Sequence, residues 1–195
     1  MGGVPHRSYD HYCGVSRALD VVGDRWSLLL VRELSSGPRR YSDLFADLPG
    51  ISTDILAARL KDLERDGILT RQRVGPRAST AVYELTATGT ALRPVLDALS
   101  VWGTPLLGER RATDAVRAHW FALPLGRAVA QHFPDETVTV FIGDTVFHVT
   151  VDDAGHVSHH DGPAAEPGRA LHLDLDTATA VAIGAVPLAE VAESR

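Results

Sequence analysis

Two aspartates two residues apart, Asp174 and Asp176, come closest to a catalytic pair in this sequence. They end the alternating stretch 170–176, which predicts a strand on which both carboxylates share one face. Paired carboxylates can divide the acid and base roles of a reaction. No candidate nucleophile or phosphate-binding glycine loop lies nearby in the sequence. The pattern therefore favours a solvated strand face, and we expect no catalytic residues and no enzymatic activity.

Histidine is the second residue type that suggests chemistry, because seven of the nine histidines follow residue 109. His159 and His160 are adjacent, so they point to opposite faces of any strand. His148, His156 and His172 have no cysteine or acidic partner at a recurrent ligand spacing. We expect no metal and no other cofactor. The histidines are assigned to turns and a solvent face, where they could confer pH sensitivity.

The single cysteine, Cys13, excludes an internal disulfide framework and a multi-cysteine zinc site. Helical patterning begins near it, and the positive end of a helix dipole favours the thiolate. Arg17 lies one turn further on. One hypothesis is therefore a thiol that senses oxidants or electrophiles, and the other is a small buried apolar residue.

Composition limits the class of protein. The chain has 195 residues, 45% of them hydrophobic, which allows one large or two small domains with real cores. It has no run of about 18 apolar residues and no signal-peptide core, so we expect a cytoplasmic protein that does not enter a membrane. Residues 1–108 hold 13 Lys/Arg and 12 Asp/Glu, whereas residues 109–195 hold 6 and 13. An acidic half is a poor DNA surface, so any DNA binding falls to the first half.

The stretch 52–66 has the strongest local pattern. Ser52 can cap a helix that stops before Gly67, and three leucines form one stripe along it. The stripe consists of Leu56, Leu60 and Leu63. The opposite face carries Asp54, Ala57, Ala58, Lys61 and Arg65. Small residues followed by charges suit a helix inserted into a DNA groove, although an ordinary surface helix has a similar face.

The neighbouring segments complete a DNA-binding arrangement. Asp24 is the predicted N-cap of a central apolar helix over 25–34, and Ser42 of a short helix through Leu48. The Pro49-Gly50 turn then leads into the Ser52 helix, which gives a helix-turn-helix. Behind it, residues 68–74 and 80–85 alternate around a turn and predict a hairpin. Its arginines, Arg71, Arg73 and Arg77, lie where the wing of a winged helix meets phosphates.

A string of spaced motifs between Tyr12 and Gly103 resembles the HxlR branch of the MarR-like transcriptional regulators. The motifs are Cys13, 18–26, 32–34, 37–44, 49–52, Leu56, Arg59-Leu60, Leu63-Glu64, Gly67, 83–86 and Gly89. The resemblance implies a homodimer that binds double-stranded operator DNA, with the Ser52 helix of each subunit in the major groove. It also matches Cys13 to a position that some members use for sensing. The candidate DNA-contacting residues are Arg40, Ser42, Ser52, Thr53, Asp54, Ala57, Arg59, Lys61, Arg71, Arg73 and Arg77.

A long helix is predicted after the wing, capped by Thr86 and kinked at Pro94. Its face from Leu92 to Trp102 is too apolar for solvent, so it packs against a partner helix or against the second half of the same chain. The family resemblance favours the partner, through this helix and the N-terminal one. The candidate dimer-interface residues are Val15, Leu19, Leu96, Leu99 and Trp102.

The composition changes at Glu109, which predicts a winged helix-turn-helix domain over 1–108 and a smaller α+β domain over 109–195. In the second domain we expect a helix capped by Thr113 or Asp114 through Leu123, and another over 124–133. Four strands follow, over 137–143, 146–151, 157–160 and 170–176, and Thr177 caps a last helix through Ile183. The predicted fold class is α+β, with an antiparallel sheet closed by apolar helices.

The alternating apolar residues of these strands give the sheet one buried face, which Val181 and Ile183 can cover. Residues 138–191 resemble the sterol carrier protein-like fold, which implies an apolar tunnel for a hydrophobic small-molecule effector. The chain stops where that family adds a strand, so a solid core is the alternative.

The leading hypothesis is a sequence-specific homodimeric transcriptional regulator controlled by a hydrophobic effector or by Cys13 chemistry. The alternative is a carrier of lipids or hydrophobic ligands whose winged helix is an interaction platform. The operator sequence, and whether binding represses or activates, stay open.

Overall fold

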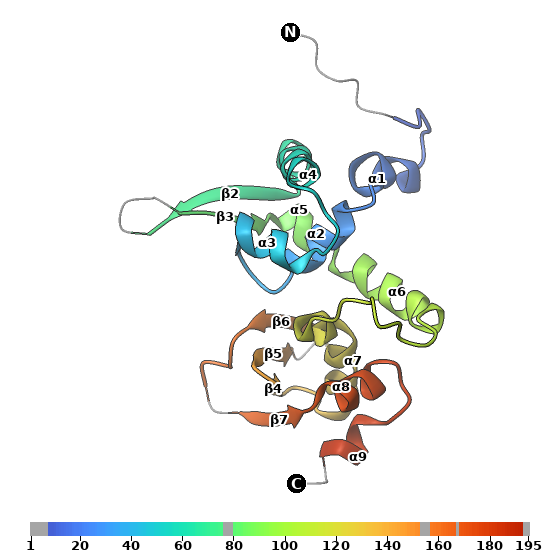
Figure 1. Ribbon diagram of the computed structural model, residues 1–195, viewed down its shortest axis with the longest axis vertical. Coiled ribbons are helices and arrows are strands. Elements are labelled where there is room, and N and C mark those ends of the chain that lie inside the picture. Colours follow the sequence, from blue (N-terminus) through green and yellow to red (C-terminus); the bar gives the residue numbers. More distant parts are fainter. Residues whose placement is uncertain (1–7, 76–79, 153–156, 167, 193–195) are drawn as a thin grey trace. The chain divides into compact units, whose positions relative to one another are not determined.

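The structure is a computed structural model that describes residues 8–75, 80–152, 157–166 and 168–192. They form two compact units that divide between Arg93 and Pro94, with Ser35–Gly37 belonging to the second unit (Figure 1). The compositional boundary after Gly108 stays a prediction about domains. Within the described ranges, no helix has the length and apolar character needed to cross a membrane.

The first unit contains five helices and a small sheet among its described residues. Its elements are α1 (Gly14–Val22), α2 (Ser27–Leu34), β1 (Arg39–Arg40), α3 (Tyr41–Asp47), α4 (Thr53–Arg65), β2 (Leu69–Val74), β3 (Thr80–Leu85) and α5 (Ala87–Thr90). The strand order is β1-β3-β2 and both pairs are antiparallel, with Arg39 opposite Tyr83 and Leu69 opposite Leu85. The predicted helix-turn-helix and hairpin are both present, and β1 adds a third strand to the hairpin.

The apolar stripe of α4 explains how this unit is held together. Leu56, Leu60 and Leu63 are almost fully buried, in one core with Leu30 of α2 and Leu44 of α3. Burying one such side chain stabilises the fold by about 1.5–3 kcal/mol. The helix ends as predicted at glycine. Gly67 adopts φ 70°, and the Ile68 N–H donates to the Leu63 carbonyl oxygen at 2.9 Å.

Of the three N-caps predicted in this region, one is confirmed and two are wrong. Ser52 caps α4, because the Ile55 N–H donates to its Oγ at 3.3 Å. Asp24 does not cap α2, which begins at Ser27, because the Asp24 carboxylate pairs with Arg59 instead. Ser42 lies inside the first turn of α3, which begins at Tyr41.

The single kinked helix predicted after the wing is two helices, α5 and α6 (Arg93–Gly103). Thr86 caps α5 as expected, accepting from the Gly89 N–H at 3.1 Å. Pro94 lies in the first turn of α6. A missing N–H costs no helical hydrogen bond there, so proline begins a helix at this point instead of bending one.

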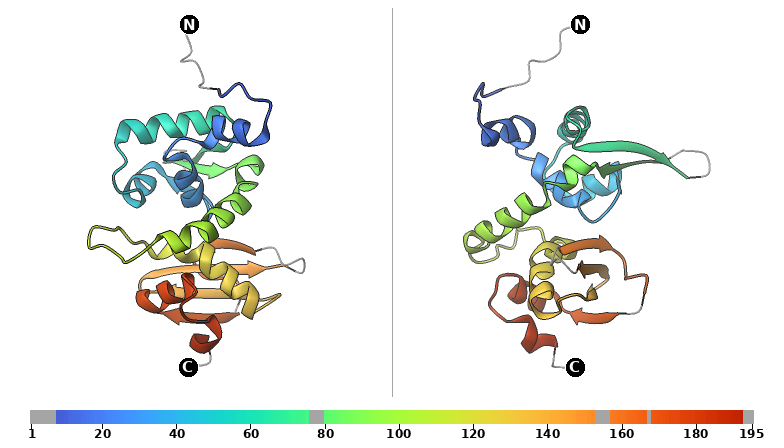
Figure 2. Two further views of the ribbon diagram at one scale, coloured as in Figure 1. Left: turned by 90° about the vertical axis from the view of Figure 1, so that its right-hand side faces the viewer. Right: turned by 180° about the vertical axis from the view of Figure 1, so that it is seen from behind.

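The second unit is a sheet with helices on one face (Figures 1 and 2). Its remaining elements are η1 (Thr104–Leu106), η2 (Ala118–Phe121), α7 (Ala122–His132), β4 (Thr137–Ile142), β5 (Thr145–Val151), β6 (Val157–Asp161), β7 (Arg169–Leu173), α8 (Leu175–Ala182) and α9 (Leu188–Ala192). The strand order is β6-β5-β4-β7. Because β7 runs parallel to β4, the sheet is mixed and the predicted fully antiparallel sheet is wrong. Strands β6 and β7 follow one another in the chain but lie at opposite edges of the sheet, and they run in the same direction.

One face of this sheet is buried beneath α7 and α8. Val138, Val140 and Phe147 are completely inaccessible, and Val181 covers them from α8. Ile183 is 44% exposed, so its predicted place over the core is wrong, because α8 ends at Ala182 and leaves Ile183 as the C-cap. Fifteen buried side chains join in one core cluster. A packed core of this kind favours the solid alternative over an apolar tunnel.

The boundary between the last strand and α8 differs from the prediction. Strand β7 ends at Leu173, and Asp174 caps α8 by accepting from the Thr177 N–H at 2.7 Å. Asp174 and Asp176 therefore do not share a strand face, and Thr177 is not the cap. The short polar side chain of Asp174 favours a cap over continued strand alternation.

Two further expectations for this unit are wrong. The helix expected from Thr113 or Asp114 through Leu123 is replaced by η2 and the start of α7, which carries Pro124 in its first turn. His159 is also not on a solvent face. It is only 4% exposed, because it lies opposite Val149 on the core side of the sheet.

Candidate nucleic-acid interface

Helix α4 presents a polar face on the side opposite its leucines, as the sequence predicts. Asp54, Ala57 and Lys61 are all exposed. Ser52 and Thr53 are exposed at the N-terminal end, where the helix dipole and free N–H groups favour an anion. The helix thus offers small side chains along its middle and polar groups at its start, so another surface could approach its backbone closely.

The turn before α4 is fixed by side-chain contacts with α3. Gly50 adopts φ 90°, a conformation that other residues rarely adopt, and so turns the chain between the two helices. The Tyr41 hydroxyl donates to the Thr53 carbonyl oxygen at 2.9 Å. Two predicted contact residues, Arg40 and Ser42, are the sequence neighbours of Tyr41, and both are exposed. The helix-turn-helix is therefore held by both its core and a polar contact.

Two basic residues of α4 are already paired within the unit. The Arg59 guanidinium bonds to Asp24 and, at 2.7 Å, to Asp62, and its side chain is only 24% exposed. Arg65 bonds to Asp62 at 2.8 Å and to Asp66 at 2.9 Å. The hydrogen bond to Asp66 raises the pKa of Arg65 above its ordinary value. Arg59, a predicted DNA contact, therefore anchors α4 to the segment before α2 in this structure.

The remaining predicted cations stay available to an outside partner. Arg40, Lys61, Arg71 and Arg73 are exposed and form no ion pair with any described residue. Arg71 and Arg73 are two apart on β2 and so share one face, where the Arg71 guanidinium lies 6.0 Å from the centre of the Tyr83 ring. The hairpin that carries them projects from the helices of its unit (Figure 2). Arg77, the third predicted wing arginine, lies outside the described residues.

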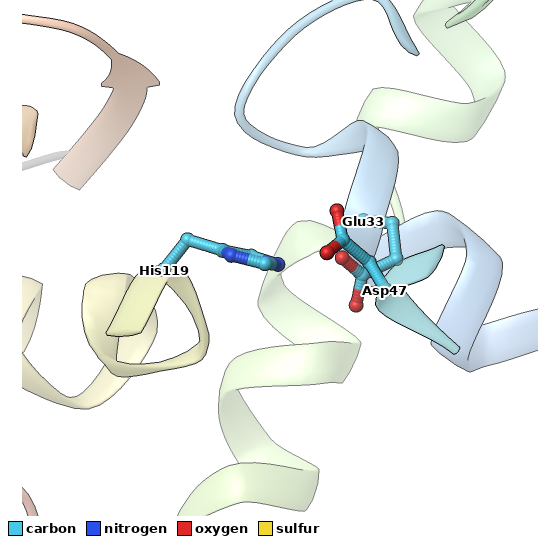
Figure 3. Close-up of side chains that lie close together, drawn as sticks. All are labelled: Glu33, Asp47 and His119. Carbon is cyan, nitrogen blue, oxygen red and sulfur yellow. The ribbon is translucent and has the colours of Figure 1, made fainter. Parts of the chain in front are cut away.

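Charged side chains of α2, α3 and β1 that the sequence did not single out lie close together in the first unit. Figure 3 shows the Glu33 and Asp47 carboxylates side by side, with oxygens within 4.8 Å of one another; the His119 in that view belongs to the second unit. Glu33, which is 1% exposed, accepts from Arg32 at 2.6 and 2.9 Å, and Arg39 approaches Asp47 at 4.0 Å. Removing Arg32 would take a partner from the buried Glu33 carboxylate, which is costly at a site without water. The only indication of these charges in the sequence was a glutamate, Glu33, inside a helix predicted to be apolar and central.

The Cys13 thiol is exposed in this chain, in the N-cap position of α1. Hydrogen bonds from the backbone N–H groups of Ser16 and Val15 lower the pKa of the thiol. The alternative of a small buried residue therefore does not describe the single chain. An accessible thiol with more thiolate character is a reactive one.

The predicted dimer residues differ in exposure. Val15 and Leu19 of α1 and Leu99 and Trp102 of α6 are exposed apolar side chains, with Trp102 at 70%. Leu96 is buried at 7% in the single chain. Four of the five residues are therefore available to a second subunit, whereas Leu96 serves the packing of its own chain.

Comparison with known proteins identifies the class of protein. The HxlR-like helix-turn-helix family matches residues 21–111. An uncharacterised HTH-type transcriptional regulator of Synechocystis sp. is 39% identical over 102 residues, covering 51% of this chain and 73% of the relative. The HTH-type transcriptional regulator YodB of Bacillus subtilis is 36% identical over 85 residues, covering 44% and 76%. The chain belongs to the HxlR-like family of winged helix-turn-helix transcriptional regulators.

Solved structures give matches over about half of the chain. The reduced form of YodB from B. subtilis is 31% identical, covers 52% of this chain and all of that one, and has a TM-score of 0.44. The redox regulator HypR in its oxidised form is 29% identical, covers 51% and 100%, and has a TM-score of 0.46. The sterol carrier protein-like resemblance of the second unit stays a prediction, because the family match ends at residue 111.

Proposed function

We propose that this protein is a sequence-specific regulator that binds operator DNA as a homodimer, with α4 of each subunit in a major groove. The observation that carries the proposal is the polar face of α4, where Asp54, Ala57 and Lys61 are exposed while the leucines anchor the helix. A recognition helix needs such a face, because base edges are read by short polar and apolar side chains in the groove. Family membership supports the same role.

Phosphate contacts come from the groups around the helix. Arg40, Ser42, Ser52 and Thr53 lie at the start of α3 and α4, and Arg71 and Arg73 lie on the wing. Arginines on a projecting hairpin reach the DNA backbone more readily than base edges, so they position the protein without specifying sequence.

The homodimer follows from the exposed apolar residues of α1 and α6. Val15, Leu19, Leu99 and Trp102 would each leave a large apolar surface in water if the chain stayed monomeric. A two-fold arrangement also places two α4 helices on successive turns of DNA, so we expect the operator to contain two half-sites. Native mass spectrometry of the full chain measures this state directly.

The test is a gel shift on DNA from upstream of the protein's own gene, with wild type and Ala57→Glu. The variant should abolish binding because it places a carboxylate against the DNA, while unfolding stability changes by only about 0.5 kcal/mol at an exposed site. Ala87→Glu is the matched control, since Ala87 is exposed on α5 and is not among the candidate DNA contacts. Equal binding by Ala57→Glu contradicts the proposal. A wild type that binds none of this DNA favours the carrier module with an interaction platform.

Control of DNA binding through Cys13 is a second candidate, favoured by the exposed thiol and its lowered pKa. Cys13→Ser should bind DNA as wild type does but lose the response to an oxidant such as diamide. As no second cysteine exists in the chain, an oxidised product that persists is intersubunit or mixed with a small thiol. If diamide changes the DNA binding of both proteins equally, Cys13 has no role in this control.

Control by a hydrophobic effector would need space inside the second unit, where the core cluster is packed. Such a ligand must also bind the DNA-competent and incompetent states with different affinity, because equal affinity shifts nothing. Titrating fatty acids while following melting temperature and DNA affinity tests this. If neither changes, the apolar core serves only to build a scaffold or dimerisation domain.

A further inference from the structure

The face of the second unit's sheet that α7 and α8 do not cover carries residues 162–166 and Gly168, here called the strap, between β6 and β7 (Figure 1). The strap is tied to the strands beneath it. The Gly162 N–H donates to the Val146 carbonyl oxygen at 3.0 Å, and the Ala164 N–H donates to Thr139 Oγ1 at 3.2 Å. A buried hydroxyl that accepts from a crossing loop fixes that loop against the sheet. The strap can therefore serve as a fixed wall of a pocket.

Beside the strap is a pocket of about 430 Å³, within the size range of small-molecule sites. The residues that line it are Glu136, Thr137, His148, Thr150, Ala164, Ala165, Glu166, Gly168 and Arg169. Gly168 is required where the strap meets the sheet, because a Cβ there would lie 2.7 Å from the Thr137 carbonyl oxygen. The close approach keeps the wall in place. None of these residues belongs to the candidate DNA interface.

The pocket presents hydrogen-bond acceptors. His148 Nδ1 lies 3.0 Å from the Gly162 carbonyl oxygen, which can only accept, so Nδ1 carries the hydrogen. In the neutral ring, Nε2 is then the acceptor. The ring also stacks on His160 at 5.5 Å, which limits its rotation. The Thr137 and Thr150 hydroxyls, 3.3 Å apart, add two more oxygens to the floor.

Charge decides which ligand fits. Arg169 is the one guanidinium of the lining, and it is compensated by Glu136 at 3.0 Å and held 4.2 Å from the Phe133 ring centre. Glu166 forms no ion pair with any described residue, so its charge is uncompensated. Two carboxylates against one guanidinium leave the pocket with a net negative charge. Such a site attracts a cation that donates several hydrogen bonds.

We propose that this pocket binds a small organic ammonium ion, with Glu166 as its counter-ion and with Thr137, Thr150 and His148 as acceptors for its N–H groups. The DNA-binding role of the first unit is not needed for this proposal. The binding can be measured without DNA, so a failure here leaves the proposed regulator function untouched.

The test titrates the full chain with 1,4-diaminobutane and follows backbone amide shifts by NMR. We expect saturable shifts confined to residues 136–150 and 164–169. The neutral analogue 1,4-butanediol and the anionic succinate match the probe in length and should give no saturable shifts. Saturable binding of the diol, binding of succinate, or no saturable binding of the diamine would each overturn the proposal.

Two variants separate this pocket from the general attraction of amines to an acidic protein. Glu166→Gln should weaken diamine binding about tenfold, because a charge-assisted contact becomes neutral. Asp144→Asn removes the same charge from the exposed turn between β4 and β5, outside the pocket, and should leave the affinity unchanged. Equal weakening by both variants means that net charge alone attracts the amine, and the proposal fails.

Discussion

The two units differ in the sign of the exposed charges that are left without an ion-pair partner: basic in the first unit and acidic in the pocket of the second. In the first unit the basic side chains Arg40, Lys61, Arg71 and Arg73 make no ion pair with a described residue, whereas Arg59 and Arg65 are engaged by aspartates. In the second unit the arginine of the strap pocket is compensated and a glutamate is left over. The composition gives the sign of the net charge of each half of the chain. Only the pairing of side chains shows which charges can meet a ligand.

The units also differ in how they are stabilised. The first unit buries leucines of its helices together with one charged side chain, Glu33, which is paired with Arg32. The second buries an almost entirely apolar cluster between α7, α8 and the sheet. Charges in the first core demand correct partners and so specify geometry, whereas apolar burial in the second is tolerant of detail.

The largest expected effect is on the apolar core of the second unit. Phe147→Ala should lower the free energy of unfolding of that unit by about 3–5 kcal/mol, because Phe147 is fully buried and its removal leaves a cavity. Phe141→Ala is the control, since Phe141 lies on the other face and stacks on His172 at 4.4 Å. Hydrogen exchange of the backbone amides measures the stability of each unit in both variants. Loss of protection throughout the first unit in Phe147→Ala would break the description of two separate cores.

Next in size is the difference between two neighbouring basic residues of α4. Lys61→Ala should weaken DNA binding. Its free energy of unfolding should stay within about 0.5 kcal/mol of wild type, as expected for an exposed site. Arg59→Ala should instead cost about 1 kcal/mol of stability, because Asp24 loses its partner and Asp62 keeps only Arg65. Gel shifts and thermal melts on both variants give the comparison. A stable Arg59→Ala that loses DNA binding would return Arg59 to the interface.

A smaller effect is expected on the wing. Arg73→Ala should weaken binding to all DNA sequences alike and reduce the slope of log affinity against log salt by about one unit. The affinity is measured at several salt concentrations on the operator and on an unrelated duplex. If base preference changes while the salt slope does not, Arg73 reads bases and the positioning role is wrong.

The smallest effect concerns Cys13. Since the Ser16 and Val15 N–H groups lower the pKa of its thiol, the thiolate should form at lower pH than in an ordinary cysteine. The rate of alkylation by iodoacetamide should then rise with a midpoint below about 8.5, the ordinary thiol value. Urea-unfolded protein is the control, because the hydrogen bonds are lost there. Identical midpoints would remove the structural basis for a sensor.

Local signals predicted most of the first unit. Ser52 as a cap, the leucine stripe and Gly67 are all read within one helix, so the interactions that decide them are close in sequence. Asp24 was misassigned for the opposite reason: its partner, Arg59, is 35 residues away. The approach of Glu33 to Asp47 likewise needed the folded chain, whereas the partners of Arg65, Asp62 and Asp66, lie within one turn of it. The exposed face of α4 was predictable, but not which of its cations are free.

The sequence by itself determined the winged helix-turn-helix, the position of the helix capped by Ser52 and the apolar face of the second sheet, because periodicity and capping are local properties. Only the tertiary structure decided that β7 runs parallel to β4, that Asp174 ends a strand, and that a strap crosses the polar face beside Thr137 and His148. These features depend on which edge of the sheet the chain returns to. That choice is set by packing between segments far apart in the sequence, which no local pattern records.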